Sequence, residues 1–212
     1  MKSLFKPILL LATIIILTAC GTNIVRSERT FTLLQENITK IVNELSEIQL
    51  QESYIQKDFE ATLNASEDLS DFTDIESDIY KNLNQRQNHL KALNELNEKL
   101  KKLKDEIANE DFSNDKQLQD QVNTITDALD PLHQDLQVYI DDYTASLKPE
   151  KETYQSVANK KIDYHSFANV FDNINTLNRT NLINLEKVLG YFEQINANII
   201  DIKVYITNLE NQ

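Results

Sequence analysis

The residue with the clearest chemistry is Cys20, the only cysteine in the 212-residue chain. It follows Leu17, Thr18 and Ala19, a pattern that resembles the bacterial lipobox, in which small residues precede a cysteine at the cleavage point. Small side chains let the backbone enter a peptidase site, and a thiol can form a thioether with diacylglycerol. The alternative is a cysteine that happens to end an ordinary signal peptide. With no second cysteine a disulfide framework is ruled out, so the pattern favours lipidation of Cys20.

The segment before this cysteine has the features of a cleaved signal peptide. Lys2 and Lys6 are followed by an apolar run from Pro7 to Leu17, the length of a signal-peptide core and shorter than the roughly 20 residues of a membrane helix. We expect a lipoprotein signal peptide at 1–19, a lipidated tether at 20–26 and a single helical-bundle domain at 27–212. The mature chain would then be lipid-anchored at the extracytoplasmic face of the cell membrane.

The three histidines offer the remaining metal or acid–base chemistry. His89, His133 and His165 lie far apart, and only His133 has a carboxylate, Asp130, one helical turn before it. A di-iron bundle needs Glu-x-x-His on two helices and a Glu on each of the others, and this chain lacks that set. We predict no catalytic residues, no metal site and no cofactor. We therefore expect that the protein is not an enzyme.

Tyrosine and phenylalanine concentrate in the second half of the chain. Such residues either line a groove that stacks on sugar rings or fill wide positions of a helical core, and their places on the apolar period favour the core. Tyr143, Tyr154 and Tyr164 flank the last predicted turn. They are the candidates for a surface contact with a glycan or a protein.

Charge restricts the partners. Cleavage would remove two lysines and leave 19 basic residues against 34 acidic ones. Nucleic-acid binding needs clustered Lys and Arg, so we expect no nucleic-acid partner. The same charge opposes direct attraction to anionic lipid or teichoic-acid phosphates. The densest basic run, Lys99 to Lys104, is flanked by acids and is typical of a solvated helix face.

Glycine scarcity indicates the fold class. The chain has only Gly21 and Gly190, and past the predicted signal peptide only Pro131 and Pro149. Sheets, hairpins and phosphate-binding loops use glycine where the backbone needs positive φ or close approach. The sequence therefore predicts an all-α protein and excludes Gly-rich nucleotide motifs.

Apolar residues recur at alternating spacings of three and four, which predicts amphipathic helices packed along a seam. The expected helices lie near 27–65, 71–109, 114–158 and 164–210. Each would be roughly 60 Å long, and short connections would make neighbours antiparallel. We expect an elongated up-and-down four-helix bundle; the alternative is a three-helix bundle with one helix peripheral.

Finer details are expected at the helix ends. A capping box at Thr73 to Glu76 predicts the start of the second helix, and Ser113 or Asn114 would cap the third. We expect a kink at each internal proline rather than a break. Residues 175–184 offer few core positions, which predicts a locally irregular helix or looser packing there.

With the lipobox and four long helices in place, the chain resembles the YkyA-type family of cell-wall-binding lipoproteins of low-GC Gram-positive bacteria. The resemblance rests on Leu-Thr-Ala-Cys20-Gly, on the acidic helical body, and on the segment from Tyr139 to Tyr154. It implies an up-and-down four-helix bundle without a catalytic site, and a role at the cell wall. This chain is richer in Asn and poorer in Lys than the family pattern.

These observations predict a non-enzymatic, membrane-anchored extracytoplasmic lipoprotein. Its partners would be the membrane, through the lipid, and peptidoglycan or another envelope protein. The alternative is a helical protein-interaction scaffold at the cell surface with no affinity for wall polymer.

Overall fold

The computed structural model describes the backbone of residues 5–158 and 164–210. Its elements are the helices α1 (Phe5–Ala65), α2 (Asp78–Ala108), α3 (Lys116–Val157) and α4 (Tyr164–Glu210), with a short 3₁₀ helix, η1 (Ser70–Thr73), between α1 and α2. Across these two ranges every regular element is a helix. The predicted all-α class is confirmed.

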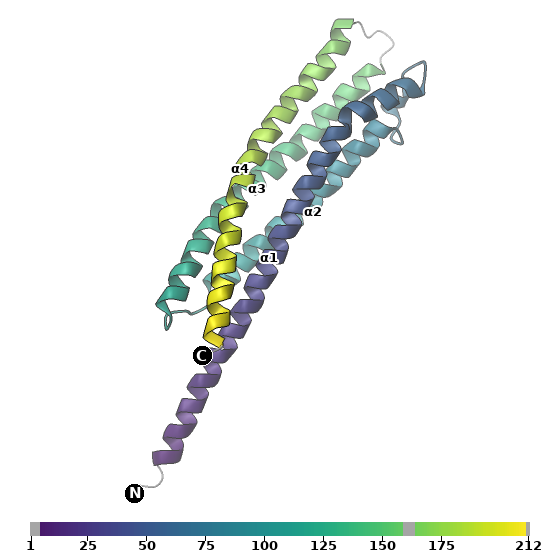
Figure 1. Ribbon diagram of the computed structural model, residues 1–212. Helices are drawn as coiled ribbons and strands as arrows, with labels where there is room; N and C mark the ends of the chain where they lie inside the picture. The colour runs from purple at the N-terminus through teal and green to yellow at the C-terminus, as the bar shows by residue number, and fades with distance from the viewer. Residues whose placement is uncertain (1–4, 159–163, 211–212) are drawn as a thin grey trace.

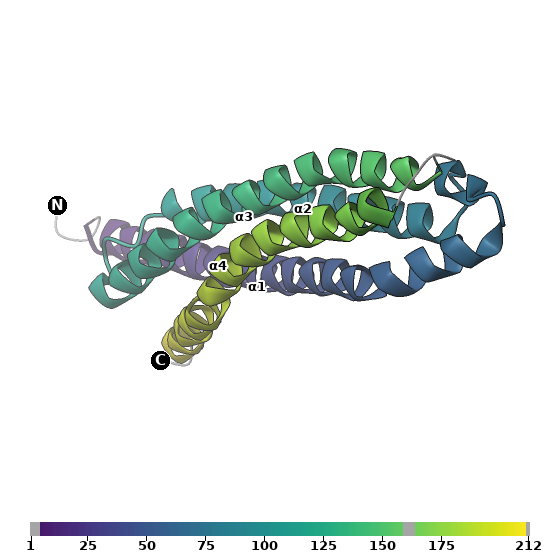
Figure 2. The same ribbon diagram turned by 90° about the horizontal axis from the view of Figure 1, so that it is seen from above.

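The helices form an elongated up-and-down bundle in which successive helices run antiparallel (Figures 1 and 2). The closest packing is within two helical hairpins, α1 with α2 and α3 with α4. Contact between α2 and α3 joins one hairpin to the other. Contact between α1 and α4 is sparse by comparison. The N-terminal part of α1 continues past the end of the bundle (Figure 1). The four-helix prediction is therefore confirmed over the three-helix alternative.

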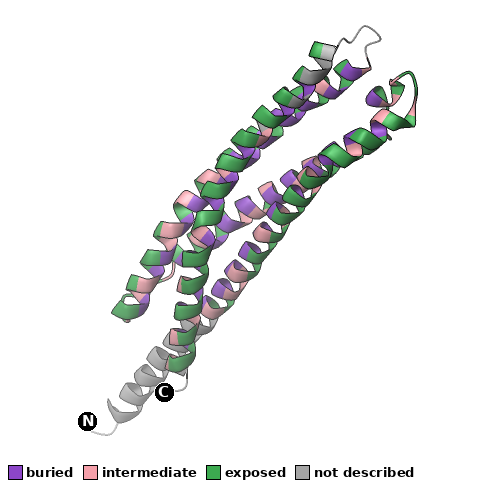
Figure 3. Ribbon diagram, turned by 45° about the horizontal axis from the view of Figure 1, so that its top comes forward, coloured by how far each residue is buried: buried purple, intermediate pink, exposed green. Residues whose placement is uncertain are grey.

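One apolar stripe on each helix is buried, as the spacing of three and four requires. Figure 3 shows buried and exposed positions alternating along every helix, with the buried ones facing the neighbouring helices. On α1 the stripe consists of Phe31, Leu34, Ile38, Ile41, Leu45, Ile48, Ile55 and Phe59. Because each stripe extends along most of its helix, the core is a long seam rather than a compact centre.

The predicted capping box at the start of the second helix is wrong. Thr73 ends η1, and its hydroxyl donates to the carbonyl of Ser70 at 2.8 Å. The helix begins at Asp78 after Ser77. The reason lies in Phe72, which is fully buried and packs on Phe59 with ring centroids 4.9 Å apart. Because the Phe72 ring is buried against α1, residues 70–73 cover the end of the α1–α2 hairpin and do not start a helix.

The N-cap of the third helix lies one residue after Asn114 and two residues after Ser113, the two predicted caps. The carboxylate of Asp115 accepts from the backbone N–H of Leu118 at 3.0 Å, so Asp115 rather than Ser113 or Asn114 is the N-cap. From there α3 passes through both prolines without the break that the prediction excluded. The kink expected at each proline stays a prediction.

The first helix begins well before residue 27, so that expected boundary is wrong. Residues 22–30 contain neither Gly nor Pro, and nothing in them stops a helix from propagating. Cys20 lies within α1, but its side chain is outside the described residues, as is the turn predicted at 159–163. At the other end of the chain, α4 is continuous through 175–184, so the predicted local irregularity is wrong. Leu182 and Ile183 are exposed in this stretch, and looser packing there stays a prediction.

Candidate functional site

A cluster of charged and phenolic side chains interrupts the apolar core where α1, α2 and α3 meet. At its centre are Arg86 of α2 and Glu150 of α3, both essentially without exposure to solvent. Each occupies a position on the apolar period of its helix: Arg86 lies between Leu83 and Leu90, and Glu150 lies on the same stripe of α3. The regular helices therefore carry both charges inward.

The two charges form a bidentate ion pair. One guanidinium nitrogen of Arg86, Nη1, donates to Glu150 Oε2 at 2.9 Å, and Nη2 donates to Oε1. Nε donates to the side-chain carbonyl of Asn82 at 2.9 Å, and the Tyr154 hydroxyl donates to Glu150 Oε1 at 2.6 Å. Every charged atom thus has a partner, which is the condition under which a buried pair is tolerated.

The cluster is tied to α1 by two further links. Tyr143 accepts from Arg86 Nη1 at 3.3 Å and donates to Glu52 Oε1 at 2.6 Å. Asn82 donates to the backbone carbonyl of Gln51 at 2.7 Å and to Asp58 Oδ2 at 2.8 Å. Three helices are therefore held in one register by side chains from each.

Burial shapes the electrostatics of this cluster. Burial alone would lower the pKa of Arg86, but the charge of Glu150 more than offsets it, so this pKa lies well above its ordinary value. Burial raises the pKa of the Tyr143 hydroxyl and keeps it protonated. For Glu52 burial also dominates, and its pKa is raised despite the hydrogen bond from Tyr143 and the charge of Arg86.

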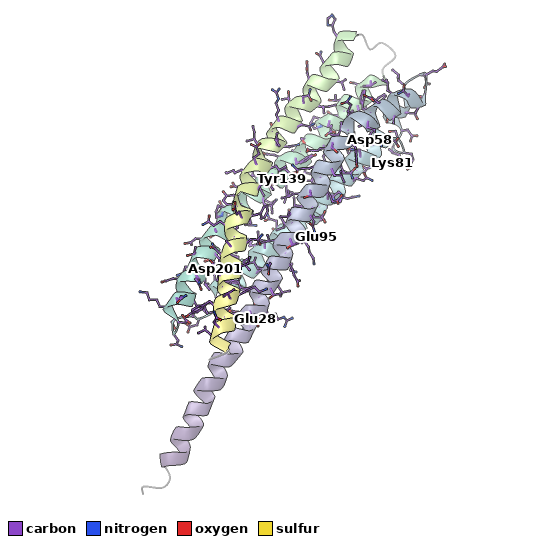
Figure 4. The ribbon with its side chains drawn as sticks, viewed as in Figure 1. Glu28, Asp58, Lys81, Glu95, Tyr139 and Asp201 are labelled. Carbon is purple, nitrogen blue, oxygen red and sulfur yellow. The ribbon has the colours of Figure 1, made fainter. Side chains whose placement is uncertain are left out.

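Glu52 also borders a groove between α1 and α4. The groove has a volume of about 670 Å³ and lies toward the turn end of the α1–α2 hairpin, the end marked by Asp58 and Lys81 in Figure 4. Glu28 and Asp201 mark the part nearer the opposite end. It is lined by Glu52, Ser53, Ile55, Gln56, Phe59, Glu60, Leu63, Ile174, Asn175 and Asn178. Its volume is in the range of small-ligand sites.

The tyrosines proposed for a surface contact are not at the surface. Tyr143 and Tyr154 are fully buried, which corrects that expectation. Partly buried Glu52 and buried Glu150 accept hydrogen bonds from their hydroxyls and so allow each phenol to lie in the core. The side chain of Tyr164 lies outside the described residues. Sequence analysis missed Arg86 and Glu150, although each fills a seven-residue gap in an otherwise apolar period.

The histidines do not converge. His133 pairs with the side chain of Asn97 at 3.0 Å, while Asp130 accepts from Lys104. His89 pairs with Glu44 at 2.8 Å. In the ranges covered by the structure, no group of three or more His, Cys, Asp or Glu side chains is placed to hold a metal ion.

In the part of the chain whose side chains the structure describes, which begins at Arg26, no helix is both long and apolar enough to cross a membrane.

The fold and the site define a class: an elongated all-α bundle with a partly buried carboxylate in a groove and an ion-paired core, an arrangement suited to binding. The model of the YkyA family, described as "Putative cell-wall binding lipoprotein", matches residues 23–203. The chain belongs to this family. Comparisons with curated proteins and with solved structures found no match.

Proposed function

We propose that this chain is a non-enzymatic lipoprotein that is anchored to the outer face of the cytoplasmic membrane of a Gram-positive cell and binds peptidoglycan. The observation that carries the proposal is the family match over residues 23–203, whose description names both the cell wall and a lipoprotein. The fold supports it, because a long bundle with a groove in its side offers surface for contact with a polymer rather than an enclosed reaction site.

The anchor would be the lipidated Cys20, exposed as the new N-terminus after cleavage of residues 1–19. Cys20 and Gln56 both lie in α1, and 36 residues of helix span about 54 Å. The groove would therefore be held about 50 Å from the lipid, measured along the helix. A rod of this kind places a binding surface away from the membrane, in the space where wall polymer lies.

Retention on purified peptidoglycan tests this function. The lipoprotein, extracted from membranes in detergent, is mixed with insoluble peptidoglycan freed of teichoic acid, with and without calcium, and sedimented. We expect the protein in the pellet at physiological salt. Recovery only in the supernatant under both conditions would refute wall binding and leave the anchored bundle without this ligand.

A second candidate function is self-association as a surface scaffold, and one feature of α4 favours it. Five large apolar side chains are between 42 and 67% exposed on this helix: Leu182, Ile183, Leu189, Ile200 and Val204. Their spacing places them on one face, and the outer side of α4 is exposed along its length (Figure 3). A second copy of the chain would cover this face.

Light scattering tests this candidate function. It is measured in the absence of detergent on the unlipidated helical-bundle domain and on its Ile200→Lys variant. A dimeric mass that falls to the monomer in the variant would support self-association. A monomeric mass at all concentrations would exclude it.

A further inference from the structure

The groove between α1 and α4 combines an apolar interior with hydrogen-bonding edges. Ile55 and Phe59 from α1 and Ile174 from α4 are nearly buried and form its inner side. Amide side chains stand on both edges: Gln56 on α1, and Asn175 and Asn178 on α4. A primary amide both donates and accepts hydrogen bonds, so these edges match the N–H and C=O groups of a peptide backbone.

The charged residues that line the groove are both acidic, Glu52 and Glu60. In the adjoining core, Arg86 forms a bidentate ion pair with Glu150, so Glu52 shares the charge of this guanidinium with Glu150. Among the residues whose side chains are described, no lysine or arginine forms an ion pair with Glu52. Asp58, which accepts from Asn82 at 2.8 Å, adds a further negative charge. The groove therefore has an unmatched negative potential at Glu52, and a ligand cation placed there would be strongly favoured.

We propose that this groove binds an unlinked stem peptide of peptidoglycan, with the free ammonium group of the peptide against Glu52. The inference rests on the proposed wall-binding function and deepens it by naming the part of the polymer that is recognised. Small alanyl methyl groups fit against Ile55, Phe59 and Ile174, and the peptide backbone pairs with the amides of Gln56, Asn175 and Asn178.

Charge complementarity selects this occupant over other parts of the wall. Phosphate-rich polymer would be repelled by Glu52 and Glu60, and a bare sugar chain would leave the charge of Glu52 unmatched. An ammonium group supplies the matching positive charge, and the partial burial of Glu52 strengthens the attraction between the two groups. The raised pKa of Glu52 agrees with this reading, because a carboxylate that is costly to ionise alone becomes favourable to ionise beside a cation.

The test is binding of a defined peptide to the detergent-extracted lipoprotein. The probe is N-acetyl-L-alanyl-D-isoglutaminyl-L-lysyl-D-alanyl-D-alanine, followed by isothermal titration calorimetry. Its control is the same peptide acetylated on the lysine side chain. We expect at least tenfold weaker binding of the acetylated peptide, because it lacks the cation.

Variants locate the site. Glu52→Gln retains an oxygen that accepts from Tyr143 and is expected to weaken binding of the free-amine peptide at least tenfold. Glu47→Gln, an equal charge change at an exposed position of the same helix, is the matched control and should bind like the wild type. Asn175→Lys places a competing cation at the exposed edge without touching the core cluster, and should also weaken binding at least tenfold.

Equal affinity for the two peptides, or undiminished binding by both Glu52→Gln and Asn175→Lys, would overturn the groove proposal. Preferential binding of D-alanylated teichoic acid over the peptide would overturn it as well. Sedimentation with peptidoglycan separates this proposal from the function on which it rests. If the wild type and both variants are retained equally, the wall-binding function stands and the groove assignment falls; if the wild type is not retained, the proposed function itself fails.

Discussion

Arg86 and Glu150 are a buried charge pair in a core that is mostly apolar. Such a pair contributes little net stability over an apolar replacement, because desolvation offsets most of the attraction. Its value lies in specificity: Arg86 has bonding partners on α2 and α3, and Tyr143 extends the cluster to α1. A sliding of one helix by a turn would leave these charges unpaired, so the cluster opposes alternative registers of a repetitive seam.

Removing one partner of this pair should be costly. Glu150→Ala leaves the Arg86 guanidinium buried without a carboxylate, and we expect a loss of about 3–5 kcal/mol in the free energy of unfolding. Urea denaturation followed by circular dichroism measures it. The control is Glu152→Ala, whose ion pair with Lys148 is largely exposed and should change stability by no more than about 0.5 kcal/mol. Similar losses in the two variants would contradict the assigned role of the cluster.

The raised pKa of Glu52 predicts a pH-dependent effect of its removal. As the pH rises past the ordinary value of 4.5, the unfolded chain releases this proton before the folded chain does, so the wild type loses stability. Glu52→Gln cannot ionise and avoids that loss. We expect the stability of the variant relative to the wild type to be lowest at about pH 4 and to rise toward about pH 7.

Urea denaturation of both proteins at several pH values across this range gives the difference directly. Tyr143, Arg86 and Glu150 act on the residue 52 side chain in both proteins, so their contributions cancel to first order. A stability difference that stays constant or falls with rising pH would show that Glu52 is not the group that burial perturbs.

Among the elements, α3 connects the two hairpins, and its first turn receives support from α4. Asp115 caps this turn by accepting from Leu118. The Tyr205 hydroxyl of α4 donates to the same carboxylate, 3.0 Å from each oxygen. The Asp115 side chain thus caps the N-terminus of α3 and holds the C-terminal part of α4 beside it.

Replacing this cap should weaken both contacts. Asp115→Ala removes the acceptor for Leu118 and Tyr205, and we expect a loss of about 1–2 kcal/mol in the free energy of unfolding. Thermal melting provides the measurement, with Asn114→Ala as the control because Asn114 is exposed and is not the cap. A larger effect at Asn114 than at Asp115 would mean that the helix starts where the sequence alone suggested.

On the scale of the whole molecule, the proposed anchor and the groove lie far apart along one helix. This arrangement separates attachment from recognition, and a rod built on a continuous apolar seam keeps the two at a set distance. The excess of acidic residues would oppose adhesion to phosphate-bearing polymer, so in the proposed function selectivity would depend on the groove.

Attachment of the molecule should depend on one sulfur atom. Cys20→Ala removes the thiol that would form the thioether, and we expect neither acyl incorporation nor the mass decrease that accompanies removal of residues 1–19. Mass spectrometry of the N-terminal peptide and labelling with radioactive palmitate measure both. Thr22→Ala, two residues beyond the cleavage point, should be processed and labelled normally. Acyl label on the Cys20→Ala protein would refute Cys20 as the anchor.

The sequence by itself was sufficient for the fold class and for the helix count. Scarce Gly and Pro and an apolar period of three and four residues leave few structures other than long helices, and both are properties of a local stretch of chain. The same period leaves a gap between apolar residues at Arg86 and at Glu150, but the spacing alone did not single them out as buried charges. Helix ends were less predictable. The capping box at Thr73 to Glu76 does not start a helix, because Phe72 is buried against α1 and this tertiary contact cannot be read from the local sequence.

Only the tertiary structure decided which residues meet. The pairing of Arg86 with Glu150, 64 residues apart, and of Tyr143 with Glu52, 91 residues apart, depends on the register between helices. A period tells which side of a helix faces inward but not the height at which it meets its neighbour, because that height is set by packing and polar pairing across the seam. These contacts hold Tyr143 and Tyr154 in the core, where the sequence had suggested a surface position. They also hold Glu52 beside the groove.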